Sequence, residues 1–294
     1  MERNNHLDSG AVKNVSGSGD YFDSEGNYVG PVVVIVGPTG SGKTGVSIEI
    51  AKKINGEIIS ADSRAIYKGM DIGTAKPTLA ERDGVPHFGF DLVEPGERFT
   101  AADFKVYAEE KIAEIRKRGH VPIIAGGTGL YVDALVYDYK FGEAPDTRSA
   151  VNNYHRHDNY DAQNDGLDHA ADRKEICTNY LLVGIKWSPE ELRKRLTLRA
   201  EQMFCSGLIE ETKALVQKYD WSTQAMKSNV YQFVWQYLQG EITAERAKEL
   251  FVFDDWHLAK RQLTWFKRTK EIIWMPLEKI YSFVVEYIEN EQRK

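Results

Sequence analysis

The segment from Gly37 to Thr44, Gly-Pro-Thr-Gly-Ser-Gly-Lys-Thr, has the residue types and spacing that hold phosphate groups. It fits the pattern G-x-x-x-x-G-K-[ST] and stands between an apolar β-branched run and a helical pattern. The glycines let backbone N–H groups converge on phosphate oxygens, and the helix start adds positive potential. Lys43 adds a positive charge, and the Thr44 hydroxyl is a ligand type for Mg²⁺. The motif predicts binding of a di- or triphosphate, with a chance glycine-rich turn as the alternative. The residues expected to hold the phosphates are Gly37, Pro38, Thr39, Gly40, Ser41, Gly42, Lys43 and Thr44.

Two further polar residues, Asp62 and Thr128, follow predicted strands. Ligands of parallel α/β sheets bind at the carboxyl ends of the strands. If the strand before Asp62 lies beside the phosphate-loop strand, its carboxylate is placed to hold a metal or to accept a proton from a nucleophile. The Thr128 hydroxyl is suited to bond a leaving oxygen or an incoming group. For both residues, capping of the next helix is the alternative interpretation.

The strand expected over residues 121–125 ends in Gly126-Gly127-Thr128. ATPases and GTPases of this architecture usually hold Mg²⁺ with an Asp at the end of a strand. Because that carboxylate is missing after residue 125, the motif does not by itself indicate nucleotide hydrolysis.

The elements that must position these residues alternate between strands and helices. Strands are expected at residues 31–36, 57–60, 121–125 and 180–185, with 88–92 as a further candidate. Helices are expected over 43–54, from Thr100 to Gly119, from Gly129, and after Ser188, where Ser188 and Glu191 form a capping box. This alternation predicts a P-loop NTPase-like parallel sheet flanked by helices, with a helical C-terminal part.

Composition divides the chain into four segments. They are a flexible leader at 1–30, an α/β core at 31–140, a polar insertion at 141–179, and the last core strand with C-terminal helices at 180–294. The insertion holds His155, His157 and His169. Their spacing matches no zinc motif, so a solvated loop is favoured over a metal site.

The chain has 294 residues and a formal net charge of −6. No apolar run is long enough to span a membrane, residues 1–30 lack the apolar core of a secretory signal, and Cys177 and Cys205 form no disulfide pattern. These features predict a cytoplasmic protein. Acidic proteins seldom coat nucleic acid nonspecifically.

The charge is nevertheless uneven. Residues 181–294 hold 18 Lys and Arg against 16 Asp and Glu, whereas residues 1–180 hold 20 against 28. An anion-binding or RNA-binding face is therefore possible in the second half, where two basic clusters occur, the second interleaved with Trp256, Trp265 and Phe266. A solvated face is the alternative for each residue of the clusters, which are Arg193, Lys194, Arg195, Arg199, Lys260, Arg261, Lys267, Arg268 and Lys270.

Several strings of residues resemble one family, the tRNA dimethylallyltransferases, also called tRNA isopentenyltransferases. The most specific is Asp-Ile-Gly-Thr-Ala-Lys-Pro at 71–77, preceded by Ile-Ser-Ala-Asp-Ser-Arg at 59–64. The resemblance continues through Gly-Gly-Thr-Gly-Leu-Tyr at 126–131 and Ala-Lys-Arg-Gln-Leu-Thr-Trp-Phe at 259–266, and covers roughly residues 32–148 and 180–275.

The resemblance implies that the exocyclic amine of an adenosine beside the tRNA anticodon attacks dimethylallyl diphosphate and that diphosphate leaves. It implies that Asp62 is the general base, that Thr128 contacts the bridging oxygen or the base, and that Arg199 is a second cation on the diphosphate. It also implies Mg²⁺ on Thr44. A monomer is expected. The residues expected to contact tRNA are Asp62, Ser63, Arg64, Ala65, Thr128, Arg148, Lys260, Arg261 and Gln262.

The chain departs from the family pattern at two places. Position 65 is Ala65, where the family usually has a Gln that helps to recognise adenine, and only 31 residues separate Arg148 from Tyr180, where the family has a long helical insertion that clasps the anticodon arm. The shortened, polar segment and Ala65 make a cytokinin-type enzyme that prenylates AMP, ADP or ATP the main alternative. A small-molecule P-loop kinase and an RNA-binding protein without catalytic activity are the others.

Overall fold

The part of the chain that the computed structural model describes comprises residues 21–141, 176, 179–223, 225–227 and 230–291. Six strands in this part form one parallel sheet in the order β3-β2-β4-β1-β5-β6. The predicted α/β fold is therefore confirmed. The strands are β1 (Val32–Val36), β2 (Gly56–Ala61), β3 (His87–Phe88), β4 (Val121–Gly126), β5 (Tyr180–Lys186) and β6 (Ile273–Pro276).

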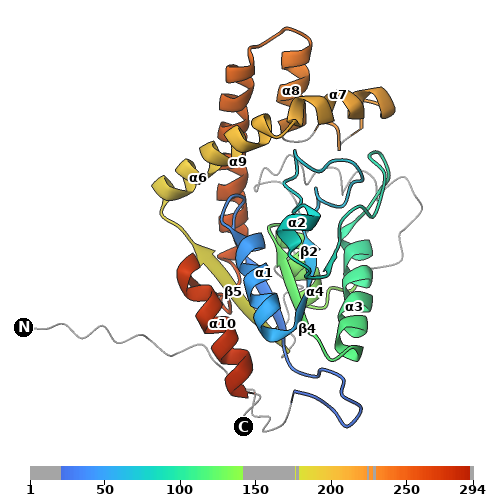
Figure 1. Ribbon diagram of the computed structural model, residues 1–294, viewed down its shortest axis with the longest axis vertical. Coiled ribbons are helices and arrows are strands. Elements are labelled where there is room, and N and C mark those ends of the chain that lie inside the picture. Colours follow the sequence, from blue (N-terminus) through green and yellow to red (C-terminus); the bar gives the residue numbers. More distant parts are fainter. Residues whose placement is uncertain (1–20, 142–175, 177–178, 224, 228–229, 292–294) are drawn as a thin grey trace, which may run out of the picture.

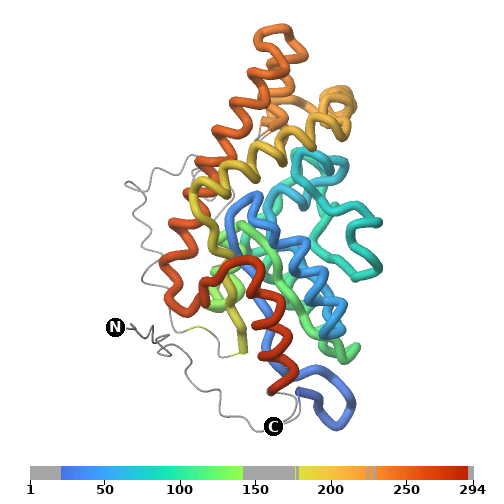
Figure 2. Tube along the Cα trace, turned by 60° about the vertical axis from the view of Figure 1, so that its left-hand side comes forward, coloured from blue at the N-terminus to red at the C-terminus, as the bar shows by residue number. Residues whose placement is uncertain are grey.

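Helices cover both faces of the sheet and continue beyond its carboxyl edge (Figures 1 and 2). The capping boxes at Thr100 and Ser188 are present as predicted. The helices are α1 (Lys43–Ile54), α2 (Leu79–Arg82), α3 (Ala101–Lys117), α4 (Gly129–Val136), α6 (Pro189–Cys205), α7 (Leu208–Lys218), α8 (Val230–Leu238), α9 (Ala244–Phe266) and α10 (Leu277–Glu291).

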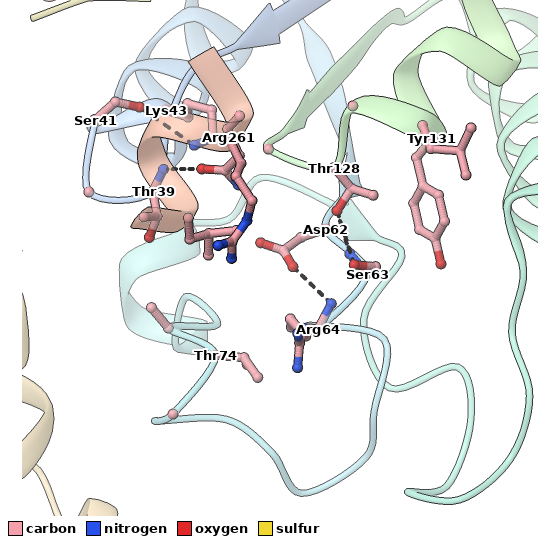
Figure 3. A pocket seen from close by; sticks show the side chains of 18 of the residues that line it. Thr39, Ser41, Lys43, Asp62, Ser63, Arg64, Thr74, Thr128, Tyr131 and Arg261 are labelled. Carbon is pink, nitrogen blue, oxygen red and sulfur yellow. Dashed lines mark hydrogen bonds between the residues drawn. The ribbon is translucent and has the colours of Figure 1, made fainter. Parts of the chain in front are cut away.

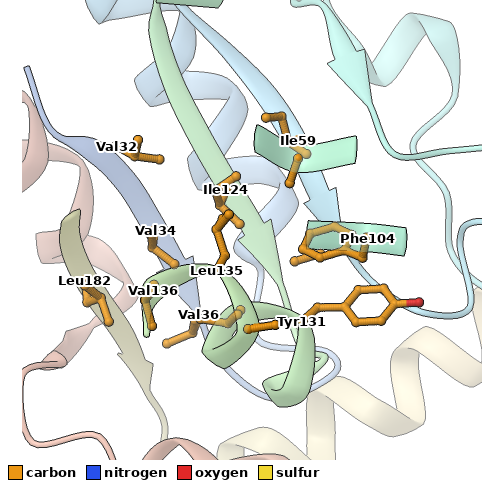
Figure 4. Packing of buried hydrophobic residues seen from close by; sticks show 14 of the residues in the cluster. Val32, Val34, Val36, Ile59, Phe104, Ile124, Tyr131, Leu135, Val136 and Leu182 are labelled. Carbon is orange, nitrogen blue, oxygen red and sulfur yellow. The ribbon is translucent and has the colours of Figure 1, made fainter. Parts of the chain in front are cut away.

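The two faces of the sheet bury alternate residues of each strand. In β1, Val33 and Ile35 pack with α1 and α10, whereas Val34 and Val36 pack with α3 and α4 (Figure 4). All five residues of β1 are buried. Because successive side chains point to opposite faces, a strand with apolar residues at every position must lie between two helical layers. The phosphate-loop strand is consequently enclosed between two helical layers.

Three features differ from the sequence prediction. First, β4 lies between β1 and β2, so the strand before Asp62 is not a direct neighbour of the phosphate-loop strand. Second, β5 is not the last strand, because residues 273–276 pair with β5 as the parallel edge strand β6. Those four residues are too short to stand out beside the helical patterns around them. Third, the strand expected at 88–92 is reduced to two residues, His87 and Phe88.

The end of the predicted flexible leader packs against the core. Tyr28 is only 1% exposed, and its hydroxyl donates a hydrogen bond to the Pro31 carbonyl at 3.0 Å. Its backbone N–H donates to the Arg116 carbonyl at the end of α3. The described residues 21–30 are thus held in place, in contrast to the frayed segment that their polar composition predicted.

Helices α6 to α9 enclose a separate apolar cluster that also includes Met70. Glu211 on α7 joins this cluster to the segment 71–77. Its carboxylate accepts hydrogen bonds from the backbone N–H groups of Asp71 (3.0 Å), Ile72 (2.7 Å) and Gly73 (3.0 Å), and from the Tyr231 hydroxyl (2.6 Å). One carboxylate thereby fixes the shape of the most family-specific string in the sequence.

Lys76 holds the same segment from inside. Its ammonium, which is almost completely buried, donates to the Tyr67 carbonyl (2.5 Å) and to the carboxylates of Asp71 (2.8 Å) and Asp91 (2.6 Å). Paired carboxylates compensate the loss of hydration of a buried charge. One anion, Glu211, and one cation, Lys76, therefore hold residues 71–77 in a fixed conformation.

Replacement of Glu211 tests whether its carboxylate stabilises the segment 71–77. Glu211→Ala leaves three backbone N–H groups and the Tyr231 hydroxyl without their acceptor, so we expect the free energy of unfolding to fall by about 2–3 kcal/mol. Glu210→Ala, at the exposed neighbouring position, is the matched control and should change it by less than about 0.5 kcal/mol. Urea denaturation measures both. Equal losses in the two variants would contradict the assignment.

Candidate functional site

The ends of β1, β4 and β2 meet at one edge of the sheet. Val36 and Ala61 both pair with Gly126, so the residues that follow, Gly37 and Asp62, lie on opposite sides of Gly127. A Cβ atom on Gly126 would lie 2.1 Å from the Ala61 carbonyl oxygen, so only glycine fits. Strands two positions apart are separated by about 10 Å. The intervening strand thus sets a fixed gap between the phosphate loop and Asp62.

The phosphate loop leads directly into α1, which begins at Lys43. The Lys43 ammonium folds back on the loop and donates to the carbonyls of Gly37 (2.9 Å) and Pro38 (2.8 Å). Loss of hydration lowers the pKa of Lys43 to about 8, an effect that the positive charge of Arg199 reinforces and the negative charge of Asp62 opposes. The three charged groups therefore act on one another within a single site.

Three side chains from outside the loop hold its backbone. The Trp187 indole donates to the Ser41 carbonyl (3.0 Å), the Arg195 guanidinium donates to the Gly40 carbonyl (2.7 Å), and the Gln262 amide oxygen accepts from the Thr39 N–H (2.7 Å). Sequence reasoning placed Gln262 among the tRNA contacts, whereas the structure places it on the phosphate loop. Helix α9 is consequently joined directly to the phosphate loop.

Asp62, Ser63 and Thr128 lie together at the other side of the gap (Figure 3). The Thr128 hydroxyl accepts from the Ser63 N–H (2.9 Å) and donates to the Ser63 hydroxyl (3.2 Å). Asp62 accepts from the Arg64 N–H through one carboxylate oxygen (2.9 Å). Thr128 is the N-cap residue of α4, but its side chain makes no capping hydrogen bond there. Its hydroxyl instead fixes the turn that carries Asp62.

Arg199 lines the same space and is paired with a buried carboxylate. Its guanidinium donates to Asp255 on α9, which is 1% exposed. Burial raises the pKa of Asp255, and the positive charge of Arg199 counters part of that rise. Two of the four cations on α6 that the sequence analysis considered for an RNA-binding face, Arg195 and Arg199, therefore have partners within the protein.

A cavity of about 1430 Å³ connects these groups. It brings together the phosphate-loop residues 39–44 and most of the other predicted site residues. Gly37 and Pro38 contribute carbonyls to Lys43 but do not line the cavity, and Ala65 is buried and does not line it either. Arg148 lies outside the described residues. The predicted residues that line the cavity beside the loop are Asp62, Ser63, Arg64, Thr128, Arg199, Lys260, Arg261 and Gln262.

Sequence reasoning missed other residues of the cavity wall. Phe99 and Tyr131 form an apolar side next to Thr128, and Tyr131 stacks on the buried ring of Phe104, 4.3 Å between centroids. Thr74 also lines the cavity and belongs to the segment that Glu211 holds. Tyr131 and Thr74 belong to the family-like strings and were available as candidates. Asp255 carries no motif, and only the fold places it behind Arg199.

This fold and site define a P-loop protein that binds a phosphorylated ligand beside a carboxylate, in a cavity with a basic rim. Comparisons with known proteins identify the family to which such a site belongs. The family model described as IPP transferase matches residues 65–172 and 163–269, and the model described as isopentenyl transferase matches residues 30–88. A tRNA dimethylallyltransferase of Staphylococcus haemolyticus is 38% identical, with 84% of this chain and 87% of that protein covered.

Two solved structures are also similar. The tRNA isopentenylpyrophosphate transferase of Bacillus halodurans has a TM-score of 0.74 at 31% identity, with 90% of this chain and 97% of that chain covered. A eukaryotic dimethylallyltransferase acting on tRNA has a TM-score of 0.68 at 25% identity, with 89% and 79% covered. The chain belongs to the tRNA dimethylallyltransferase (IPP transferase) family, and the prediction of this family of transferases is confirmed.

None of the helices in the described part of the chain combines the length and apolar composition that a membrane crossing requires.

The lowered pKa of Lys43 predicts pH-dependent binding of diphosphate. Lys43 is protonated below a pH of about 8 and loses its charge above it, so binding weakens as the pH rises through that value. Calorimetric titration with inorganic diphosphate at pH values from about 6.5 to 9.5 measures this effect. The ratio of wild-type to Lys43→Met affinity, which removes the ligand's own titration, should be largest below pH 8 and decline above it. A ratio that is constant with pH would contradict the assignment.

Proposed function

We propose that this protein transfers the dimethylallyl group of dimethylallyl diphosphate to the exocyclic amine of an adenosine next to the tRNA anticodon. The observation that carries the proposal is the position of Asp62 and the phosphate loop on opposite sides of Gly127 within one cavity. A volume of about 1430 Å³ exceeds the roughly 300–1,000 Å³ of a typical small-ligand pocket. The space therefore suits two substrates, a diphosphate ester and a nucleoside turned out of an RNA loop.

In this reaction the amine nitrogen attacks the first carbon of the dimethylallyl group. A new C–N bond forms, the C–O bond to the diphosphate breaks, and the diphosphate leaves with the electron pair. Asp62 accepts the proton that the amine loses. Because an allylic centre ionises readily, positioning and stabilisation of the departing charge supply most of the rate.

The leaving diphosphate is stabilised by groups on the loop side of the cavity. The backbone N–H groups of Gly40 and of residues 42–44, at the start of α1, offer positive potential, and Lys43 and Arg199 add positive charge. Asp255 holds Arg199 through one nitrogen of the guanidinium, so the remaining N–H groups stay available for phosphate oxygens. Thr128 holds Ser63 and with it the turn that aims Asp62.

The residues present suit a Mg²⁺ ion that is bound together with the diphosphate. Thr44 lines the cavity at the first turn of α1, and Mg²⁺ commonly uses one or two protein ligands with phosphate oxygens and water. When bound, the ion would neutralise charge on the leaving group. Thr44 is the residue we assign to it.

The acceptor distinguishes this proposal from adenylate prenylation. Arg64, Lys260, Arg261 and Arg268 line the cavity, which is more positive charge than a nucleoside monophosphate requires. A polyanionic RNA loop uses several cations. We therefore favour tRNA over AMP, ADP or ATP as the acceptor.

A comparison of Asp62→Asn with Lys43→Ala tests the proposed roles. We expect Asp62→Asn to lower the rate of label transfer from dimethylallyl diphosphate to unmodified tRNA by about 10²–10⁴-fold, because it removes the base, and to leave affinity for the diphosphate nearly unchanged. Lys43→Ala should weaken that affinity.

The same assay with AMP as the acceptor is run in parallel. Label that enters only AMP would overturn tRNA as the acceptor. Equal loss of diphosphate affinity in Asp62→Asn and Lys43→Ala would overturn the base role of Asp62. Consumption of ATP without binding of dimethylallyl diphosphate would indicate a kinase instead.

A further inference from the structure

Helix α9 and the turn that follows it present a row of polar and aromatic side chains at intervals of three and four residues, a spacing that places the helical members on one face. All but Phe253 line the cavity, and Lys260, Arg261, Thr264 and Arg268 are exposed. No acid occurs from residue 256 to 270; before this stretch Asp254 is half-buried and Asp255 is buried and paired with Arg199, and after it Glu271 is exposed. The row consists of Phe253, His257, Lys260, Arg261, Thr264 and Arg268.

The aromatic residues that sequence analysis considered for base contacts are occupied within the protein. Phe266 is completely buried, and the Trp265 indole donates to the buried carboxylate of Asp133 at 2.9 Å. Trp256 lies against the Arg193 guanidinium, 4.4 Å from the ring centroid. Each of these three rings thus has a partner within the protein, and none of them is exposed.

Phe253 differs from them. It is 64% exposed, the most exposed aromatic ring among the large apolar side chains of the described residues that lie open to solvent. Its ring lies 4.5 Å from that of His257 at an interplanar angle of 56°. His257 lines the cavity, so the pair continues the cavity wall outward along α9. At 1.5 Å of rise per residue, Phe253 stands about 12 Å along the helix from Arg261.

We propose that Phe253, supported by His257, is a stacking platform for a base of the RNA loop that lies near the reacting adenosine. This inference rests on the proposed function. An adenosine that turns out of the loop to reach Asp62 leaves its neighbours without a stacking partner, and an aromatic face replaces that partner. The cations of the same helix face hold the phosphates between the reacting adenosine and the stacked base. The charge of the row therefore favours a nucleic acid over an apolar protein surface.

Binding of an unmodified tRNA anticodon stem-loop to the full chain tests the platform. We expect Phe253→Ala to weaken binding by roughly 5- to 30-fold and Phe253→Trp to preserve it. Because stacking involves no phosphate, the slope of log K against log salt should stay unchanged in Phe253→Ala, whereas Arg268→Ala should reduce it by about one. Tyr281→Ala, which removes an exposed ring from α10, is the matched control and should bind like the wild type.

Stem-loops with one abasic nucleotide at a time identify the stacked base. At one position the abasic RNA should weaken wild-type binding while causing no further loss in Phe253→Ala, since the two changes remove the same contact. Wild-type affinity in Phe253→Ala, or additive losses at every position, would overturn the platform while leaving the proposed function intact. A wild-type protein that neither binds nor prenylates the stem-loop would instead overturn the acceptor, and the platform with it.

Discussion

The register of three strands is the constraint on which the site depends. Val36 and Ala61 pair with the same residue, Gly126, and this places the phosphate loop and the Asp62 turn at a fixed separation across Gly127. The contact between Gly126 and the Ala61 carbonyl leaves no room for a side chain. A shift of one residue in β2 would move Asp62 to the other face of the sheet, and a shift of one residue in β1 would displace the phosphate loop in the same way. The sheet therefore determines the relative position of the phosphate loop and Asp62 independently of the helices that contact them.

Side chains from the helical part of the chain hold the phosphate loop and Arg199 in position. Trp187 and Arg195 hold the phosphate-loop carbonyls, Gln262 holds an N–H of the same loop, and Asp255 holds Arg199. Each contact joins the loop or its cation to α6, to α9 or to the segment just before α6. Movement of these helices against the sheet would therefore change how the diphosphate is held. Gln262 thus connects α9, along which we propose that RNA binds, to the loop that we propose holds the diphosphate.

Much of the site could be predicted from local patterns. The phosphate loop, the Thr100 cap and the position of Asp62 at a strand end follow from short-range spacing, and the structure has all three. The intervening position of β4 and the short edge strand β6 could not be predicted, because strand order depends on long-range pairing that a single sequence does not encode locally. The ion pair of Arg199 with Asp255 has the same origin, since 56 residues separate its partners.

The two parts of the chain, which differ in net charge, also differ in how their residues serve the site. In the proposed function, the acidic first part of the chain binds phosphate mainly through backbone N–H groups and Lys43, which need no net positive charge. In the second part, Arg195 and Arg199 serve the interior of the site, and Lys260, Arg261 and Arg268 remain at its rim. A modest net charge is thus compatible with a local RNA-binding face.

The most direct test of the account is a crystal structure of the chain with an anticodon stem-loop and a non-hydrolysable analogue of dimethylallyl diphosphate. We expect the diphosphate on the N–H groups of Gly40 and residues 42–44, with the adenosine amine facing the Asp62 carboxylate across Gly127. An adenosine bound away from Asp62, or a nucleoside triphosphate in the phosphate loop in place of the analogue, would contradict it.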